Sequence, residues 1–489
     1  MNKKTIANII GALITILGIA LIIPTLISTF YGESDRNGLI ASALIALLIG
    51  LPLWFFTRKS KSISNKDGFL IVALAWLITA IIGALPFYLS GAIPNITDAF
   101  FESMSGVTTT GATIIGNPNT LPNLPNGVES LPHGILFWRS FIQWIGGMGI
   151  IVFAIAILPL LGIGGVQMFK AEVPGPVSDK LRPRVKETAK LLWAVYVGFT
   201  VVEAFLLGLA GMSWFDAICH AFTTMPTGGF STQNASIAGY QNSAIHYIII
   251  FFMLMAGINF SLHFKAVTGN LRVYFRDTEF KIFLTIIVLI TLGIFVLVSI
   301  DNGKVSHIQF RDSLFQTVSI ITTTGYGTYD YEKWSYLIQF TLFSLMFLGA
   351  MGGSTGGGIK VIRIFLIIKH GLMETRRLLH ARAIIPIRIG NRYIDESIIR
   401  NTLGFFLFYV AIFGLTAAAL TSMGIDITSA IGAAASAVGN IGPALGAFGP
   451  TDNYALLPDL GKWILSFAML LGRLEIFTIL ILFSRTYWR

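Results

Sequence analysis

The sequence predicts an all-α, polytopic membrane protein in which short re-entrant loops surround one polar axis. Two observations lead to this fold class. Of the 489 residues, 54% are hydrophobic and only 12% are charged, whereas soluble proteins contain about 25% charged residues. In addition, four apolar stretches of about a dozen residues, too short to cross a bilayer, recur along the chain and end in glycine.

The membrane-spanning helices are predicted from apolar runs of about 20 residues or more. The first run is longer than the apolar part of a signal peptide, and no small-residue cleavage site follows it. The predicted spans are 6–30, 38–57, 68–92, 134–164, 191–211, 244–264, 280–300, 334–372 (interrupted), 401–423 and 460–484.

Lysine and arginine are concentrated in alternate connections, and this bias marks the cytoplasmic side of a membrane protein. We therefore predict that both termini are cytoplasmic. The basic face either only sets orientation or also binds a partner or anionic membrane lipids. The basic residues on this side are Lys3 and Lys4, Arg58, Lys59, Lys61 and Lys66, those from Lys170 to Lys190, from Lys265 to Lys281 and from Lys360 to Arg400, and Arg485 and Arg489.

The reactive side chains give no indication of an enzyme. Cys219 is the only cysteine, which excludes an intrachain disulfide framework and a cysteine-based metal site. The seven histidines form no H-E-x-x-H pattern, so a metal hydrolase is not expected. A membrane-bound transferase would need a cluster of carboxylates or histidines at the membrane surface, and no such cluster is visible. We also expect no nucleic-acid partner.

The four re-entrant stretches share one spacing. They read "DAFFESMSGVTTTGA", "DAICHAFTTMPTGGF", "DSLFQTVSIITTTGY" and "SAIGAAASAVGNIGP". Each begins with a residue type that caps helices, and each has a glycine thirteen residues later, which indicates one unit of span, half-helix, loop and span used four times. The predicted caps are Asp98, Asp216, Asp312 and Ser429, and the glycines are Gly111, Gly229, Gly325 and Gly442.

Non-helical backbone inside a membrane is tolerated only where it is buried in protein or lines a water-filled cavity. Glycine and threonine in a single loop would be explained equally well by helix packing. Four loops with one spacing instead indicate a shared axis, around which backbone carbonyls can replace the hydration shell of a monovalent cation. Glycine allows the backbone to turn its carbonyls inward, and the half-helix C-termini carry partial negative charge. Because the loops differ, the symmetry is only approximate.

On these motifs the chain resembles the Trk/Ktr/HKT superfamily of potassium transporters, and within it the bacterial Trk-type uptake subunits. The resemblance covers essentially the whole chain and implies two extra N-terminal helices (1–66) before pore repeats 67–184, 185–276, 277–394 and 395–489. It implies potassium uptake across the bacterial cytoplasmic (inner) membrane through a channel-like pore. Potassium is then the transported ion, with no organic cofactor in this chain.

The resemblance also implies which residues form the potassium filter. Family members contribute one filter glycine per repeat, and the residues before it supply further oxygens. Gly111 stands where sodium-preferring plant relatives carry serine, which favours potassium. The fourth loop, "GNIGP", lacks threonine, so we expect weaker coordination there. The implied filter residues are Thr109, Thr110, Gly111, Thr227, Gly228, Gly229, Thr323, Thr324, Gly325, Asn440, Ile441 and Gly442.

A glycine-rich segment, "LGAMGGSTGGGIK" at 348–360, interrupts the second span of the third repeat. Six glycines disfavour helix, so they unwind the span into a movable loop. A nucleotide-binding loop would need serine or threonine after Lys360, where valine stands. In the family this intramembrane loop lies under the filter as a gate. The implied gate residues are Gly352, Gly353, Gly356, Gly357, Gly358, Lys360 and Arg473.

Arg473 lies inside the last predicted span, in "LLGRLEIF". A charge at the centre of a membrane helix costs at least about 2.5–3.5 kcal/mol unless it faces a polar cavity. In the family an arginine at this place sits below the filter, beside the gate loop. The alternative is a structural ion pair with Glu475 or Glu203.

Two questions remain open from the sequence. The resemblance implies a homodimer and a cytoplasmic nucleotide-binding regulatory subunit, called TrkA in the Trk systems, for which 369–388 is the expected docking region. Transport is predicted to be passive, and the alternative is a proton- or sodium-coupled potassium symporter. Coupled transporters usually carry carboxylates near the membrane midplane, and only Glu203 and Glu475 qualify.

Overall fold

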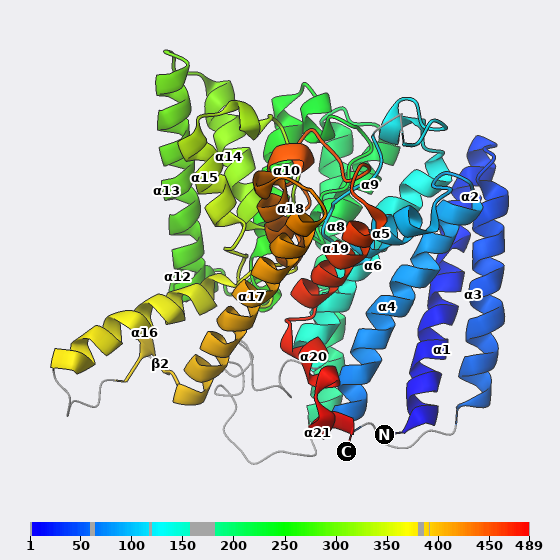
Figure 1. Ribbon diagram of the computed structural model, residues 1–489, viewed down its shortest axis with the longest axis horizontal. Helices are drawn as coiled ribbons and strands as arrows, with labels where there is room; N and C mark the ends of the chain where they lie inside the picture. The colour runs from blue at the N-terminus through cyan, green and yellow to red at the C-terminus, as the bar shows by residue number, and fades with distance from the viewer. Residues whose placement is uncertain are drawn as a thin grey trace.

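The computed structural model describes residues 2–58, 64–116, 120–156, 181–379, 386–390 and 392–488. Within these residues, seven helices are long and apolar enough to cross a membrane, or nine if each of two bent helix pairs counts as one span. One antiparallel pair, β1 (Arg388–Ile389) with β2 (Arg392–Tyr393), accompanies the helices. The predicted class of an all-α, polytopic membrane protein is confirmed. The two termini lie at the same end of the molecule (Figure 1).

The N-terminal helices form a hairpin at one side of the molecule (Figure 1). They are α1 (Lys3–Ala20), α2 (Ile22–Tyr31) and α3 (Arg36–Phe56). A Cβ added to Gly11 would lie 2.5 Å from the Trp54 amide nitrogen, and one added to Gly50 would lie 2.6 Å from that of Thr15. The helices α1 and α3 therefore cross with their backbones in contact, as small residues permit in membrane proteins.

The remaining helices follow the predicted order of span, short helix and span. The helices α4 (Asn65–Leu89), α5 (Ile96–Val107) and α6 (His133–Ala156) correspond to the first predicted repeat, and α4 begins shortly before its predicted start. The helices α8 (Leu181–Leu209), α9 (Trp214–Thr224), α10 (Ser243–Gly257), α11 (Phe260–Val267) and α12 (Arg272–Arg276) correspond to the second, and α8 likewise begins before its predicted start. The third holds α13 (Thr278–Asp301), α14 (His307–Ile321), α15 (Tyr336–Leu345) and α16 (Val361–Leu379), and the fourth holds α17 (Glu396–Ser422), α18 (Ile427–Gly439), α19 (Asp459–Arg473), α20 (Phe477–Leu480) and α21 (Arg485–Trp488).

The short helices α5, α9, α14 and α18 begin earlier than predicted, so the predicted caps Asp98, Asp216, Asp312 and Ser429 are wrong. All four of these residues lie within the helices. A second residue of capping type stands three to six positions upstream in each case, and its side chain accepts the amide two or three residues on. The observed caps are Asn95, Ser213, Ser306 and Asp426.

Two spans predicted as continuous are sharply bent. The span predicted at 244–264 turns by 103° between α10 and α11, and the one at 460–484 turns by 106° after α19. At the first bend Asn259 caps α11, and at the second Glu475 and Ile476 have φ of 58° and 51°. The predicted interruption of 334–372 is confirmed, because α15 ends at Leu345 and α16 begins at Val361. The stretch 157–164 of a further predicted span lies outside the described residues.

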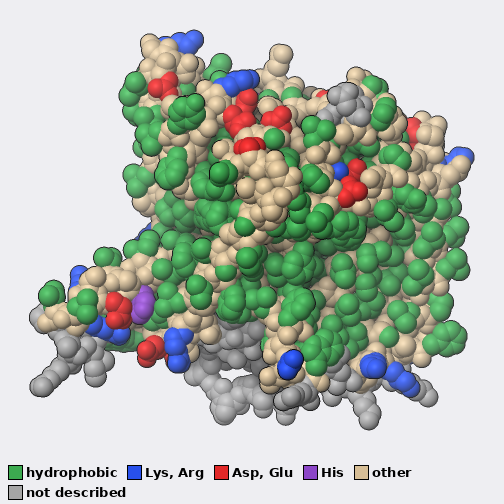
Figure 2. Space-filling view, viewed as in Figure 1, with side chains coloured by type: hydrophobic (Ala, Val, Ile, Leu, Met, Phe, Trp, Pro, Cys, Tyr) green, Lys and Arg blue, Asp and Glu red, His purple; other side chains and the backbone are tan. Residues whose placement is uncertain are grey.

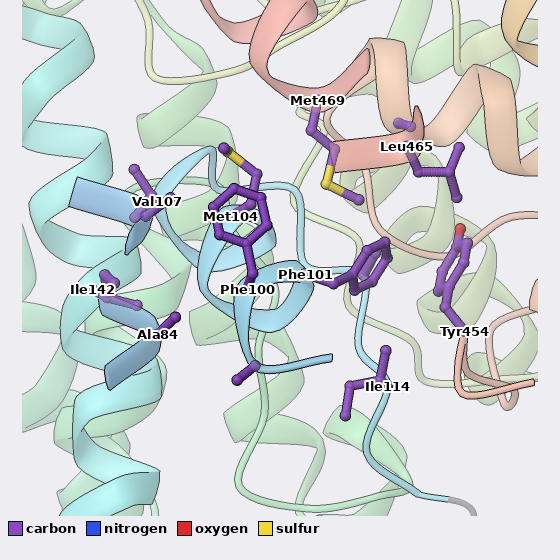
Figure 3. Packing of buried hydrophobic residues seen from close by; sticks show 14 of the residues in the cluster. Ala84, Phe100, Phe101, Met104, Val107, Ile114, Ile142, Tyr454, Leu465 and Met469 are labelled. Carbon is purple, nitrogen blue, oxygen red and sulfur yellow. The ribbon is translucent and has the colours of Figure 1, made fainter. Parts of the chain in front are cut away.

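The helix α5 lies at the centre of the largest apolar cluster. Figure 3 shows its side chains enclosed by residues from α4, α6 and α19. Those labelled there are Phe100, Phe101, Met104 and Val107 of α5, with Ala84, Ile142, Leu465 and Met469 around them. The outer face of the molecule is also apolar over a broad belt (Figure 2), as expected for a surface against lipid.

We expect Gly50→Ala to lower the melting temperature of the detergent-purified protein. The added Cβ lies 2.6 Å from the Thr15 amide nitrogen, so α1 and α3 must separate, and overpacking of this kind costs about 1–3 kcal/mol. The matched control is Gly414→Ala on α17, where no atom lies within 4 Å of the added Cβ. Equal melting temperatures for the two variants would contradict the close crossing.

Candidate ion pathway

The backbone leaves each short helix by the same path. In the first loop the Thr109 amide donates to the Gly106 carbonyl and the Thr110 amide to the Ser105 carbonyl, both at 2.9 Å. The other three loops make the same two hydrogen bonds, from an amide to the carbonyls three and five residues earlier, at 2.8–3.3 Å. They are Thr227 to Thr224 and Gly228 to Thr223, Thr323 to Ile320 and Thr324 to Ser319, and Asn440 to Ala437 and Ile441 to Ser436.

The loops also share an alternation of backbone handedness. The glycine and the residue two positions before it both have positive φ in every loop. Left-handed backbone at a threonine costs on the order of 1–3 kcal/mol and persists only where the surroundings enforce it. Such strain is typical of functional sites. The φ values are 52° and 84° for Thr109 and Gly111, 57° and 73° for Thr227 and Gly229, 59° and 81° for Thr323 and Gly325, and 55° and 105° for Asn440 and Gly442.

The four loops meet in a closed ring. A Cβ on each glycine would collide with the carbonyl oxygen of the residue that precedes the glycine in the next loop. The contacts follow the chain order and return from the fourth loop to the first, so the four loops, which carry the twelve residues predicted for the filter, surround one axis. The distances from the added Cβ to the carbonyl oxygen are 2.2 Å for Gly111 with Gly228, 1.9 Å for Gly229 with Thr324, 1.9 Å for Gly325 with Ile441 and 2.7 Å for Gly442 with Thr110.

One face of this ring opens into a cavity of about 220 Å³. All four glycines line it, together with residues that follow them in the chain. Asp452 lines it too, and burial together with the charge of Asp330 raises the pKa of its carboxyl. Figure 2 shows acidic side chains near this end of the molecule. Carboxylates at the mouth of a polar cavity attract cations.

The fourth loop carries Asn440 where the other three loops have threonine. In the first loop the hydroxyls of Thr108 and Thr110 lie 2.8 Å apart. The side-chain amide of Asn440 donates to the Thr110 hydroxyl at 3.0 Å and to the Met469 carbonyl at 2.9 Å. Asn440 therefore ties the fourth loop to the first loop and to α19.

Gln143 supports the ring and was missed by the sequence analysis. Its side chain is fully buried, donates to the Gly228 carbonyl at 2.8 Å and accepts from the Phe230 amide at 3.3 Å. Gln143 lies on α6, 85 positions before Gly228. No local pattern signals a contact over this separation, so only the fold reveals it.

The glycine-rich segment lies against the other face of the ring, formed by residues that precede the glycines. The Gly357 amide donates to the Thr323 hydroxyl at 2.6 Å, and the Thr355 hydroxyl donates to the Met225 carbonyl at 2.9 Å. A Cβ on Gly357 would lie 2.3 Å from the Gly439 carbonyl oxygen. The segment thus contacts the inner ends of the second, third and fourth loops.

The same segment is fastened at its base. The Gly349 amide donates to the Ile359 carbonyl at 2.8 Å, which closes the neck of the loop. The Gly352 amide donates to a carboxylate oxygen of Glu279 at 2.7 Å, and the ammonium of Lys360 donates to the Gly356 carbonyl.

Arg473 contacts the loop and not the glutamates considered in the sequence analysis. It is 3% exposed, and its Nη1 donates to the Thr355 carbonyl at 2.6 Å. Glu475 instead pairs with Arg363 of α16, and the buried Glu203 has no ion-pair partner among the residues that the structure describes. Arg473, Lys360 and the loop glycines line a space of only about 30 Å³.

The comparison with known proteins is consistent along the whole chain. The TrkH family, described as a cation transport protein, matches residues 36–489. The Trk system potassium uptake protein TrkH of Escherichia coli (strain K12) is 43% identical over 499 residues and covers 100% of both chains. TrkG of the same strain is 34% identical over 498 residues, covering 100% of this chain and 99% of TrkG. The crystal structure of the potassium transporter TrkH from Vibrio parahaemolyticus matches with a TM-score of 0.90 at 39% identity and 100% coverage of both chains.

Proposed function

We propose a pore mechanism for this chain, which belongs to the TrkH family of cation transport proteins and is a multi-pass, Trk-type potassium uptake transporter. In this mechanism potassium crosses the membrane through the ring of four loops without covalent chemistry. Backbone carbonyls of the twelve filter residues replace the water around the ion. The half-helix C-termini favour a cation at the axis.

The observation that carries this proposal is the closed ring. Each of its four contacts brings a glycine Cα against a carbonyl oxygen of the next loop, which requires the four loops to surround one narrow axis. The acidic residue Asp452 at the cavity on one side supports entry of cations from that side. We assign that side to the exterior, so that both termini face the cytoplasm of the bacterial cell and the protein lies in its inner membrane.

The glycine-rich segment is the proposed gate. It lies across the cytoplasmic face of the ring, where a space of about 30 Å³ holds about one water molecule and leaves no room for a hydrated ion. Arg473 holds the segment through the Thr355 carbonyl and puts a positive charge on the ion path. A homodimer and a TrkA-like regulatory subunit complete the proposal, with 369–388 as the docking region.

Coupled symport is a second candidate because of Glu203. Its carboxyl is fully buried and has no ion-pair partner among the described residues, and an intramembrane carboxyl of this kind is a candidate proton carrier. Glu475, the other candidate, is paired with Arg363. Symport would make potassium uptake follow a proton gradient, whereas a pore uses only the potassium gradient and the membrane potential.

Flux through the purified protein in liposomes tests the mechanism. An inside-negative potential of 100 mV favours entry of one positive charge by about 2.3 kcal/mol. We expect rubidium uptake to rise with this potential and to be unaffected by a pH gradient imposed at constant potential. Uptake driven by the pH gradient alone would contradict the pore mechanism and favour proton-coupled symport.

We expect Gly111→Ser to reduce the preference for potassium over sodium. The added Cβ lies 2.2 Å from the Gly228 carbonyl oxygen, and φ of +84° is strained for serine, so one wall of the ring must move. Competition of sodium with rubidium uptake measures the effect. The matched control is Gly91→Ser, which has φ of +77° but no atom within 4 Å. Unchanged selectivity in Gly111→Ser would place Gly111 outside the filter.

We expect Arg473→Ala to raise basal rubidium flux while leaving selectivity nearly unchanged. At 4 Å and an effective dielectric constant of about 20, the guanidinium raises the energy of a cation by about 4 kcal/mol, and the alanine variant also releases the Thr355 carbonyl. Arg473→Lys keeps the charge but not the planar group, so we expect an intermediate flux. Lower flux from monodisperse Arg473→Ala would rule out the barrier.

A further inference from the structure

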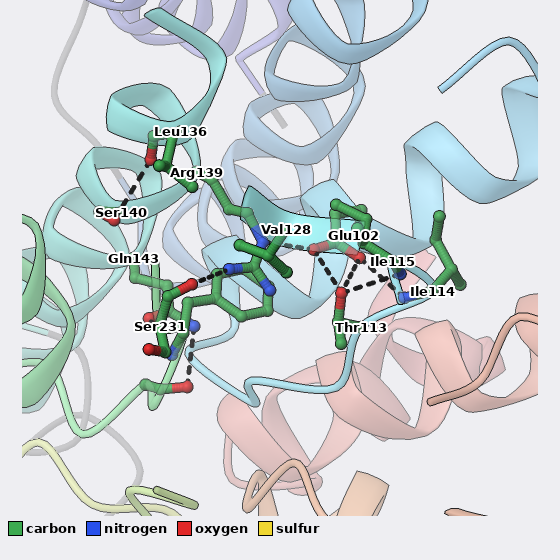
Figure 4. Close-up of polar contacts among 12 residues, drawn as sticks. Glu102, Thr113, Ile114, Ile115, Val128, Leu136, Arg139, Ser140, Gln143 and Ser231 are labelled. Atoms are coloured by element: carbon green, nitrogen blue, oxygen red, sulfur yellow. Dashed lines mark hydrogen bonds and ion pairs between the residues drawn. The ribbon is translucent and has the colours of Figure 1, made fainter. Parts of the chain in front are cut away.

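A buried ion pair joins the outer ends of the first two filter loops. Glu102 lies on α5, and Arg139 lies on α6, with 2.7 Å between Nε of Arg139 and a carboxylate oxygen of Glu102 (Figure 4). Glu102 is 0% exposed and Arg139 is 2% exposed. The pore mechanism proposed above makes no use of this pair.

The carboxylate of Glu102 holds the chain just after the first filter glycine. Both of its oxygens accept from the Thr113 hydroxyl, at 2.9 and 3.0 Å, and one accepts from the Ile114 amide at 3.0 Å. These contacts fix the segment two and three residues beyond Gly111. The Thr113 carbonyl in turn accepts the Tyr454 amide of the fourth repeat at 2.8 Å.

The guanidinium of Arg139 holds the chain just after the second filter glycine. Its Nη1 donates to the Ser231 carbonyl at 2.9 Å, and its central carbon lies 3.6 Å from the centroid of the Phe230 ring. These residues are one and two positions beyond Gly229. Arg139 also lines the cavity above the ring, where an unpaired positive charge would repel cations.

We infer that Glu102 and Arg139 are positioning residues that set the spacing between the first and second filter loops and thereby the selectivity of the ring. The inference rests on the proposed pore. A buried ion pair contributes little net stability compared with apolar side chains of similar size. Its effect is instead geometric, because the planar guanidinium bonds Glu102 and Ser231 in two fixed directions at once. The pair also neutralises the charge of Arg139 at the cavity.

The test compares potassium and sodium permeability of variants in liposomes. The double variant Glu102→Gln with Arg139→Met leaves no uncompensated charge, so it is expected to fold. We expect its potassium-to-sodium permeability ratio to fall about tenfold, which corresponds to about 1.4 kcal/mol. Arg139→Lys keeps the ion pair with Glu102 but loses the hydrogen bond to Ser231. We therefore expect a smaller fall in the permeability ratio and an unchanged melting temperature.

The control is Asp312→Asn, which breaks another nearly buried pair, Arg311 with Asp312 at 2.9 Å on α14. Within the described part of the chain the hydrogen bonds of this pair go to each other and to Ser243, not to a filter loop, so its loss is expected to leave the ratio unchanged. An unaltered ratio in the double variant overturns the inference, and so does an equal fall in the control. If the unmodified protein does not discriminate potassium from sodium in the same liposomes, the proposed pore is itself contradicted, together with the positioning role that rests on it.

Discussion

Every backbone N–H and C=O inside a bilayer needs a partner within the protein or in enclosed water. Most of this chain meets the requirement with helices, but the four loops and the glycine-rich segment lack helical bonds. In each loop two amides return to the preceding helix, as Thr109 and Thr110 do. Some of the carbonyls that follow are bound by side chains, as the Gly228 carbonyl is by Gln143 and the Gly442 carbonyl by Ser436. In the proposed pore, an ion or water on the axis would be the partner of the carbonyls that point inward.

The same requirement explains why glycine stands at the ring. Four chains that share one narrow axis approach each other to backbone contact, as Gly229 does with Thr324. The spacing between neighbouring loops is then set by hydrogen bonds and ion pairs outside the ring. These contacts differ from one pair of loops to the next. Between the third and fourth loops the Tyr331 hydroxyl donates to the Ala444 carbonyl at 2.6 Å. Between the first and second loops the link is the ion pair of Glu102 with Arg139.

Sequence reasoning found the features that leave a local pattern and missed contacts between residues that are far apart in the chain. The equal spacing of Gly111 and its three counterparts located the loops, because a repeated local structure leaves a repeated pattern. The bends at Asn259 and Ile476 were missed, because each bent pair of helices is together apolar enough to be taken for one span. The contacts of Gln143 and Arg139 join residues 85 and 92 positions apart, and neither has a local pattern. The partner of Glu475 was likewise visible only in the fold.

The glycine-rich segment satisfies its polar groups mainly with the surrounding protein, and in the proposed gate this would link opening to hydration of the pathway. Its contacts include the Thr323 hydroxyl, the Glu279 carboxylate and the guanidinium of Arg473. Each contact broken by movement leaves a buried polar group that costs about 1–3 kcal/mol unless water replaces the partner. The segment can therefore move only as water enters the space of about 30 Å³ beside it. In the proposed mechanism, water that enters would restore the hydration shell of an ion leaving the ring and would screen the charge of Arg473. One movement would then open the path and lower its electrostatic barrier.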